Sequence, residues 1–304
     1  MTNPGDACTV SSQPPVVHIR PARGWIALDF RELWQWRELL YFLTWRDVKV
    51  KYKQTLLGFA WAVIVPVGHM AVLGTIFGHF AHTPTDGLNP YLFMLMGLVP
   101  WQYFANSLSL ASNSLVGYSH LITKIYFPRL FIPLGICLAD VVDFLLAFSV
   151  LLVMIIFMQG FPALTIVFVP VLMLIAFATA LGTGLALSAL NVRYRDIRFI
   201  LPFVIQIWMY VSIIVPASQV RERWGQLAYW LYGLNPMVGV IEGTRWCLMH
   251  HLMFIEKTVL GEVQRIPVSC PWDLVIAGLP VTFLMLIFGL YYFKRMEKLF
   301  ADIV

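Results

Sequence analysis

Long apolar runs are the feature that most constrains the fold of this 304-residue chain. Hydrophobic residues make up 60% of it and charged residues only 12%, against roughly 45–50% and about 25% in soluble domains. A water-soluble core cannot bury this surplus, whereas helices of about 20 apolar residues place it in a bilayer. The sequence therefore predicts an all-α polytopic membrane protein. Its six predicted spans are Leu56–Phe80, Tyr91–Leu115, Leu130–Met158, Leu164–Leu190, Phe199–Val215 and Leu274–Phe293.

Positively charged residues near the short loops predict the orientation of these spans, because Lys and Arg are retained on the cytoplasmic side. They precede the first run, follow the last, and lie in the second and fourth connections, whereas residues 81–90 and 159–163 contain none. Both termini are therefore expected in the cytoplasm. Residues 1–28 form a polar N-terminal tail in which no cleavable signal is evident.

Residues 29–53 are predicted to form an amphipathic helix and a basic segment at the cytoplasmic interface. Asp29 and Glu32 make a capping box at the start, and apolar residues such as Trp34 and Trp45 recur on one side. A helix of this kind lies in the headgroup region. Packing against the protein's own spans is the alternative, and the two arrangements are compatible.

The segment 216–273, expected on the outer side, contains two apolar pieces that are too short to span a bilayer. They are Trp224–Leu234 and Met237–Leu252, and the Asn235-Pro236 pair between them is a turn and helix-start signal. Their aromatic residues suit a membrane interface, so we expect two short re-entrant helices that dip partway into the outer leaflet. The alternative is an ordinary extracellular loop with a small apolar core.

Two carboxylates, Asp140 and Asp143, fall inside the third predicted span, three residues apart and therefore on one helix face. Intramembrane carboxylates are costly unless they are paired, protonated or exposed to water. One interpretation is a proton relay, which would make the chain a secondary transporter. The other is that they bond to polar groups of neighbouring helices or face a hydrated cavity. His69 in the first span is a candidate partner, or else a packing residue.

A basic run lies where the chain enters the inner leaflet and consists of Arg46, Lys49, Lys51 and Lys53. Each basic residue near an anionic surface gains about 1 kcal/mol. The run is a candidate site for a lipid headgroup or lipid-linked diphosphate, and a simple topology anchor is the alternative.

Aromatic residues in or near the spans could stack on sugar rings along a passage, or could form interface belts and lipid-facing packing. The candidates for lining a channel are Trp61, Trp101, Tyr103, Trp208 and Tyr210. The sequence alone does not distinguish these two roles.

Motifs for catalysis and nucleotide binding are absent from the sequence. It contains no G-x-S-x-G, no H-E-x-x-H and no Walker G-x-x-x-x-G-K-[ST]. Its four scattered cysteines include no C-x-x-C pair and indicate no metal site, although a Cys247–Cys270 disulfide stays open. The net charge is +5, and the basic residues cluster beside apolar spans, which indicates membrane topology and not nucleic-acid binding. We therefore expect neither an enzyme nor a cofactor in this chain, and any ATP dependence would come from a partner.

Four stretches carry a resemblance to a known family. They are RDVKVKYKQTLLGFAWAVIVP (46–66), GLVPWQYFANSLSLASNSLVGYSHLITKIYFPRLFIP (97–133), NVRYRDIRFILPFVIQIWMY (191–210) and LNPMVGVIEGTRW (234–246). Their order resembles the permease subunit of O-antigen polysaccharide ABC exporters, the Wzm family.

The resemblance implies a homodimer whose subunits carry a six-span domain over residues 54–304. It also implies two copies of a separate ATPase, which binds ATP and Mg, and export of undecaprenyl-diphosphate-linked O-antigen across the bacterial inner membrane. The alternatives are capsular polysaccharide, teichoic acid or a smaller substrate, or proton-coupled transport through Asp140 and Asp143. A membrane-embedded enzyme that modifies glycans is the alternative outside transport.

The resemblance further implies a cytoplasmic coupling helix that contacts the ATPase and a periplasmic gate. Residues assigned to coupling are Ser119, His120, Lys124, Tyr126, Phe127 and Arg129. Residues assigned to the gate are Trp224, Trp230, Asn235, Pro236 and Glu242. The coupling residues would form a rigid knob with its side chains toward the cytoplasm, and an interfacial turn is the alternative. Two departures from the family pattern are VSIIVPASQV after the fifth span and the long segment 254–271.

Overall fold

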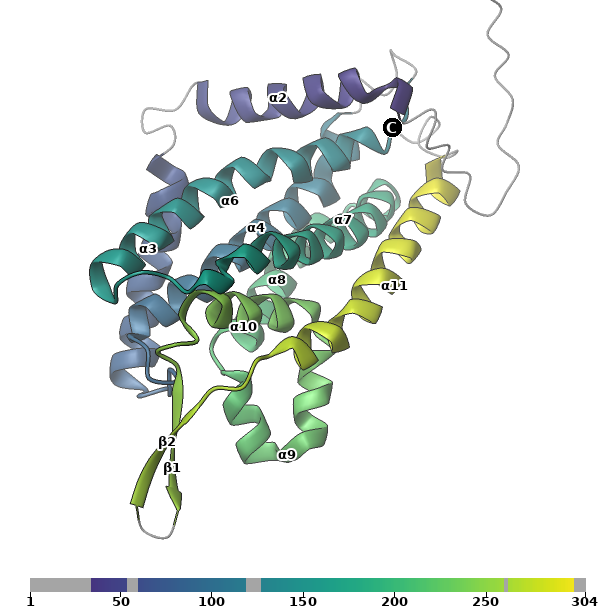
Figure 1. Cartoon of the computed structure of the whole chain (residues 1–304). Helices are drawn as coiled ribbons and strands as arrows, with labels where there is room; N and C mark the ends of the chain where they lie inside the picture. The colour runs from purple at the N-terminus through teal and green to yellow at the C-terminus, as the bar shows by residue number, and fades with distance from the viewer. Residues whose placement is uncertain (1–33, 54–59, 119–126, 260–261, 298–304) are drawn as a thin grey trace, which may run out of the picture.

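The computed structural model describes residues 34–53, 60–118, 127–259 and 262–297, and these are mostly helical (Figure 1). The α-helices are α2 (Arg37–Lys53), α3 (Ala60–Leu73), α4 (Pro90–Gly117), α6 (Phe131–Met158), α7 (Val169–Arg193), α8 (Ile197–Ile213), α9 (Ala217–Gly233), α10 (Pro236–Met249) and α11 (Trp272–Met296). A π-helix, η1 (Gly74–Phe80), continues α3, and a 3-10 helix, η2 (Leu164–Phe168), leads into α7. Two strands, β1 (Phe254–Val259) and β2 (Glu262–Pro267), pair antiparallel.

Several helical segments in the described part are long and apolar enough to cross a membrane. Four qualify singly: Val63–Phe80, Phe131–Met158, Leu164–Arg193 and Trp272–Met296. The pair of α8 and α9, bent by 90° between them, makes a fifth if it counts as one span. The chain is therefore a multi-pass membrane protein. Each of the six predicted runs overlaps a helix, but α4 does not meet this apolarity criterion, because Ser, Asn and Gln residues interrupt its apolar sequence.

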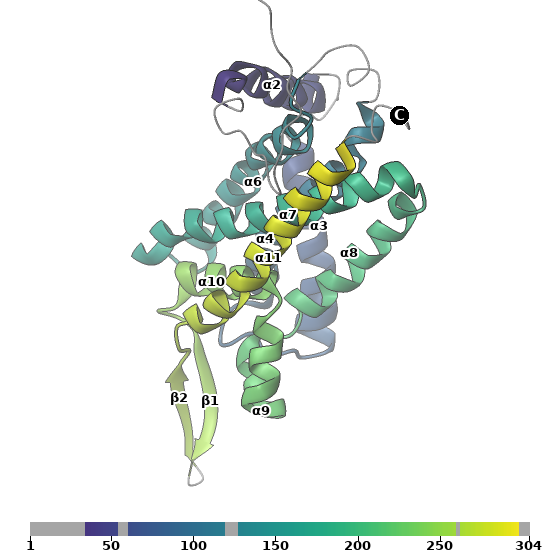
Figure 2. The same ribbon diagram turned by 90° about the vertical axis from the view of Figure 1, so that its right-hand side faces the viewer.

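The helices form one bundle with different elements at its two ends (Figures 1 and 2). At one end α2 lies across the end of the bundle and packs on α6. At the other end the strands and α9 project from the helices in both views. We call these the α2 end and the hairpin end. Helix α4 runs through the middle, packed against α6 and α7, and most of its residues are buried.

Helices α7 and α11 touch through their backbones. A Cβ atom at Gly182 would lie 2.7 Å from the backbone of Leu286, and one at Gly289 would overlap the carbonyl oxygen of Gly182. Only glycine fits at these two positions, because any larger residue would force the helices apart. The contact fixes how α11 packs along α7.

Helix α2 packs against the protein's own spans, one of the two interpretations given to this region, and its place at the membrane surface stays a prediction. Leu43 and Val48 are buried on the side that packs against α6, whereas Trp34, Tyr41 and Trp45 are exposed. An exposed aromatic face beside a packed face suits a helix at a membrane surface. The predicted capping box at residues 29–32 lies outside the described residues.

The predicted pair of short helices after the fifth run is present as α9 and α10, with a correction. Asn235 caps α10 by accepting a hydrogen bond from the Met237 amide at 3.2 Å, and Pro236 takes the first helical position, as the turn signal predicted. Helix α9 begins at Ala217 and breaks at Gly225, whose φ of 82° only glycine adopts readily. Helix α10 is buried among α4, α7 and α11, and its depth in the outer leaflet stays a prediction.

The hairpin is an addition to the mostly helical fold that was not predicted from the sequence. Its strands pair from Phe254 with Pro267 to Val259 with Glu262, within the segment that departs from the family pattern. Both strands are rich in the β-branched and alternating polar residues that favour pleated structure. Helical periodicity dominates the rest of the chain and obscured this short signal.

Candidate functional site

Near the α2 end, three charged side chains meet in a cluster that we call the inner cluster. The Lys51 ammonium at the end of α2 bonds to Asp140 Oδ1 and lies 3.0 Å from Asp143 Oδ2. Tyr52 donates its hydroxyl to Asp143, and the Ser107 hydroxyl of α4 donates to Asp140 Oδ2 at 2.9 Å. Asp140 is 1% exposed, whereas Lys51 is 28% and Asp143 25% exposed. The cluster therefore carries two negative charges and one positive charge and is open on one side.

The inner cluster explains how Asp140 and Asp143 are accommodated. Their spacing of three residues on α6 points both carboxylates at the last turn of α2, where Lys51 supplies the opposite charge. They bond to polar groups of neighbouring elements, one of the two interpretations drawn from the sequence. His69, considered as a partner, instead lies 3.0 Å from Gln102, measured between Nδ1 and Nε2.

A cavity of about 310 Å³ opens beside the inner cluster. It lies among α2, α3, α4 and α6, and its walls include Trp61, Gln102, Asn106 and Phe144 as well as the charged residues. Asn106 is exposed and has no hydrogen-bond partner among the described residues. A free amide on a buried helix needs a polar environment, so this wall faces water or a ligand.

The remaining members of the basic run have separate surroundings. Arg46 pairs with its neighbour Asp47 at 2.9 Å and lies over the Tyr118 ring at 4.7 Å. The hydroxyl of Tyr118 donates to the same Asp47 at 2.8 Å. Lys49 lies 5.4 Å from the centre of the Trp45 ring, and Lys53 is exposed. The four basic residues thus do not form one common cationic site.

The aromatic candidates for lining a channel include buried and exposed residues. Trp101 is 2% exposed and packs with Phe104 and Trp208, with ring centroids 5.3 and 6.0 Å away, which places it in the core and not along a passage. Tyr103 is buried beside the cavity and donates its hydroxyl to the Cys137 carbonyl at 3.1 Å. Trp61 and Tyr210 are exposed on α3 and α8.

The predicted coupling element is only partly described. Ser119, His120, Lys124 and Tyr126 lie outside the described residues. Phe127 is 5% exposed and packs beside Leu115 and Phe131, so the expectation that it projects from a knob is wrong. Arg129 donates to the Glu297 carbonyl at 2.8 Å, which ties the start of α6 to the end of α11.

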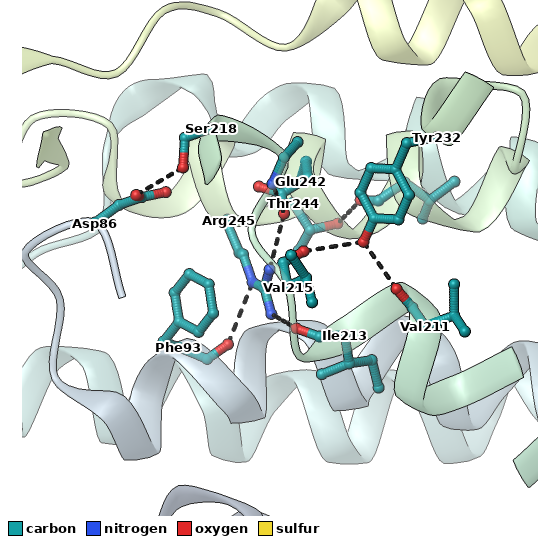
Figure 3. Close-up of polar contacts among 12 residues, drawn as sticks. Asp86, Phe93, Val211, Ile213, Val215, Ser218, Tyr232, Glu242, Thr244 and Arg245 are labelled. Atoms are coloured by element: carbon teal, nitrogen blue, oxygen red, sulfur yellow. Dashed lines mark hydrogen bonds and ion pairs between the residues drawn. The ribbon is translucent and has the colours of Figure 1, made fainter. Parts of the chain in front are cut away.

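Toward the hairpin end a second charged cluster, the outer cluster, is centred on Arg245 of α10 (Figure 3). The guanidinium is fully buried and bonds to Glu242 Oε1 at 2.9 Å, to the Ile213 carbonyl at 2.8 Å and to the Phe93 carbonyl at 3.3 Å. It also lies 3.6 Å from the centre of the Phe93 ring. Arg245 was not singled out from the sequence, although a Glu three residues before an Arg within an apolar piece is a recognisable signal.

The outer cluster holds the sharp bend between α8 and α9. Breaking a helix leaves carbonyls at its end and amides at the start of the next helix without partners. Here Arg245 donates to the carbonyl of Ile213 (Figure 3). Tyr232 donates to the carbonyls of Val211 and Val215 at 2.9 Å each. Glu242 accepts from the Ala217 amide at 3.3 Å. The sequence VSIIVPASQV thus forms its turn with side chains from α9 and α10.

Beside the outer cluster, Asp86 joins the loop before α4 to α9. It is 7% exposed and accepts a hydrogen bond from the Ser218 hydroxyl at 2.9 Å, while its carbonyl accepts from the Phe254 amide at 3.0 Å. Burial raises its pKa to about 6, with a further contribution from the nearby Glu242 carboxylate. Asp86 lines a cavity of about 550 Å³ that reaches the hairpin. Asp86 had not been singled out from the sequence.

Of the other gate candidates, the two tryptophans lie at the surface of this end, whereas Pro236 is buried. Trp224 and Trp230 on α9 are 69% and 44% exposed. Asn235 additionally donates to the Ser212 hydroxyl of α8 at 2.8 Å. In the part of the chain that the structure describes, no group of three His, Cys, Asp or Glu residues is placed to hold a metal ion.

Comparison with known proteins gives consistent relatives. A family model described as ABC-2 type transporter matches residues 38–249. The O-antigen export system permease protein RfbA of Myxococcus xanthus is 28% identical over 222 residues, which cover 73% of this chain and 84% of that protein. A protein of the same name from Klebsiella pneumoniae is 27% identical over 269 residues, which cover 88% of this chain and 95% of that protein. The polysialic acid transport protein KpsM of Escherichia coli is 25% identical over 211 residues, which cover 67% of this chain and 78% of that protein.

Proposed function

Because this chain belongs to the ABC-2 type transporter family, we propose that it is the permease subunit of an exporter for polysaccharide linked to undecaprenyl diphosphate, with O-antigen as the first candidate. The observation that carries the proposal is similarity, over most of the chain, to permeases named for O-antigen export. Similarity to a polysialic acid transport protein also supports capsular polysaccharide as the second candidate.

The proposed assembly is a homodimer with two copies of a separate ATPase that binds ATP and Mg. Six helical elements, namely α3 with η1, α4, α6, α7, α8 and α11, would cross the bacterial inner membrane. The α2 end and both termini would face the cytoplasm, and α9, α10 and the hairpin would form the periplasmic side. Exposed Trp224 and Trp230 suit that interface.

Reconstitution with the partner ATPase tests the function. The complex should hydrolyse ATP faster when lipid-linked O-antigen is added, and faster than with an unrelated lipid-linked glycan. Equal rates with and without every lipid-linked polysaccharide would contradict the proposal. Stimulation by capsular glycan alone would select the second candidate.

The energy source separates this proposal from a proton-coupled carrier. Asp140 and Asp143 are both bonded to Lys51, so their charges are paired within the protein without a proton relay. Transport in ATP-loaded vesicles should therefore continue when a protonophore collapses the proton gradient. Loss of transport while ATP hydrolysis continues would favour the carrier.

The orientation has its own test in the native cysteines. Cys270 near the hairpin is partly exposed, whereas Cys137 and Cys247 are buried. A membrane-impermeant maleimide added to intact spheroplasts should label Cys270 and spare Cys8. Labelling of Cys8 alone would invert the proposed topology.

The coupling loop can be tested at residues other than Phe127, which is buried. Replacing Lys124 and Tyr126 by Ala should weaken co-purification with the ATPase and reduce glycan-stimulated ATP hydrolysis. Unchanged values for both would place the contact elsewhere, for example at Arg193–Arg198.

A further inference from the structure

The cavity beside the inner cluster has the wrong charge for a diphosphate. With Lys51 bonded to both Asp140 and Asp143, the three side chains carry a net charge of −1. Among the described lining residues, a diphosphate would meet a carboxylate pair and no unpaired cation, and like charges at such distances repel. An apolar tail fits no better, because it would bury the charged groups without hydrogen bonds.

The same walls suit a ligand with many hydroxyl groups. Lys51 has three donors and uses two, a carboxylate offers about four acceptor positions, and the Asn106 amide is free to donate and accept among the described residues. Gln102 uses only its Nε2 atom, on His69. Sugar hydroxyls both donate and accept, so they can fill the unused hydrogen-bonding positions of these side chains without bringing charge.

Shape and aromatic character support the same ligand. Trp61, 51% exposed, lines the cavity together with the polar side chains, and an aromatic face packs against the C–H groups of a pyranose ring. The volume of about 310 Å³ is at the lower end of ligand pockets, at roughly 300–1,000 Å³. One sugar ring, and not a folded chain, is the unit that fits.

We propose that this cavity binds a single neutral sugar ring of the exported glycan through Asn106, Gln102 and the Asp143 carboxylate, with Trp61 stacked on its face. The inference rests on the proposed function and adds a recognition site to it. Lys51 then positions the two carboxylates and does not bind the diphosphate. The cavity distinguishes one sugar from another, and the diphosphate stays outside it.

Asn106→Leu tests the inference with little risk to folding, because Asn106 is exposed and no hydrogen bond to described residues is lost. In the reconstituted complex with its ATPase, lipid-linked glycan is titrated and the concentration for half-maximal stimulation of ATP hydrolysis is measured. It should rise roughly threefold to tenfold, as expected for the loss of one neutral hydrogen bond. Trp61→Leu should shift it in the same direction, and Asn106→Gln should restore much of the affinity.

Two controls assign the effect to the sugar. Ser149→Ala removes an exposed hydroxyl on α6 that bonds only within its own helix, and it should leave the titration unchanged. Sugar-free undecaprenyl diphosphate, added as a competitor, should inhibit the unmodified complex and the Asn106→Leu complex at the same concentration.

Three results would overturn the inference. If Asn106→Leu and Trp61→Leu both titrate like the unmodified complex, the cavity is not a sugar site, although export of glycan would stand. If Asn106→Leu weakens the sugar-free competitor as much as the glycan, the site reads the diphosphate. If the unmodified complex is not stimulated by any lipid-linked glycan, the proposed function fails, and this site with it.

Discussion

The inner and outer clusters place similar charges inside the same apolar protein, but they differ in how completely those charges are enclosed. Arg245 is 0% exposed, and its guanidinium contacts one carboxylate, two carbonyls and one aromatic ring. Lys51 is 28% exposed and faces a cavity with spare hydrogen-bonding groups. A closed, saturated cluster holds elements in place, whereas an open one retains capacity for a ligand.

The difference follows from what each cluster joins. The outer cluster replaces the backbone hydrogen bonds that the bend between α8 and α9 would otherwise lose. The inner cluster joins the end of α2 to α6 through side-chain bonds of Lys51 to Asp140 and Asp143. Polar groups in the outer cluster are therefore required by the fold, and those in the inner cluster are available for function.

The largest expected effect is on the outer cluster. Glu242→Ala leaves the buried Arg245 without its carboxylate, and breaking a buried ion pair costs about 3–5 kcal/mol. We expect a large loss of stability in thermal unfolding of the purified protein in detergent. Glu222→Ala, at an exposed position on α9, is the matched control and should change stability by less than about 0.5 kcal/mol. Equal stability of both variants would show that the outer cluster is not structural.

A smaller effect, dependent on pH, is expected at Asp86 at the edge of the outer cluster. Because its folded pKa is about 6 and its ordinary value is 3.8, the folded state holds this proton more tightly than the unfolded state. Its contribution to stability is therefore lost as the pH rises from about 4 to about 6, by about 3 kcal/mol in all. Asp86→Asn should remove this dependence, because the amide stays neutral and can still accept from Ser218.

Unfolding of both proteins across this pH range measures the difference directly. Other carboxylates titrate in both, including Glu242, which faces Asp86 together with Arg245, so only the difference between the two curves counts. The variant should be the more stable protein at pH 7, and the two should converge near pH 4. Parallel curves throughout would show that Asp86 is not held in a closed site.

The smallest effect is expected at the inner cluster. Asp140→Asn removes one charge beside Lys51, but Asp143 remains as its partner and solvent reaches the ammonium. We expect a loss of about 1–2 kcal/mol, measured by the same unfolding assay. A loss as large as that of Glu242→Ala would mean that the inner cluster is also closed, and the contrast between the two clusters would disappear.

Apolar periodicity and turn chemistry predicted much of this fold. The six runs overlap helices, and Asn235-Pro236 marks the start of α10, because these features depend on local sequence. The hairpin and the burial of α10 were not predicted. The hairpin is short, and among the described residues β1 and β2 pair only with each other. The burial of α10 depends on neighbours brought together from α4, α7 and α11.

The candidate site was predictable in its residue types but not in its pairing. Asp140, Asp143 and Lys51 were each singled out, yet nothing in the sequence places Lys51 against carboxylates 89 and 92 residues further along the chain. The same applies to Arg245, whose carbonyl partners come from α4 and α8. Such contacts are set by helix packing, which residue spacing within one helix does not encode.

The backbone contact between α7 and α11 at Gly182 and Gly289 has a mechanical consequence. Two helices that touch without intervening side chains have no layer of rotamers to rearrange, so sliding one along the other would meet backbone atoms directly. The two helices should therefore move together as one rigid unit during transport. Motion driven by an ATPase would then fall to elements joined through side chains, such as α2 through Lys51 and the bent pair α8 and α9 through Arg245.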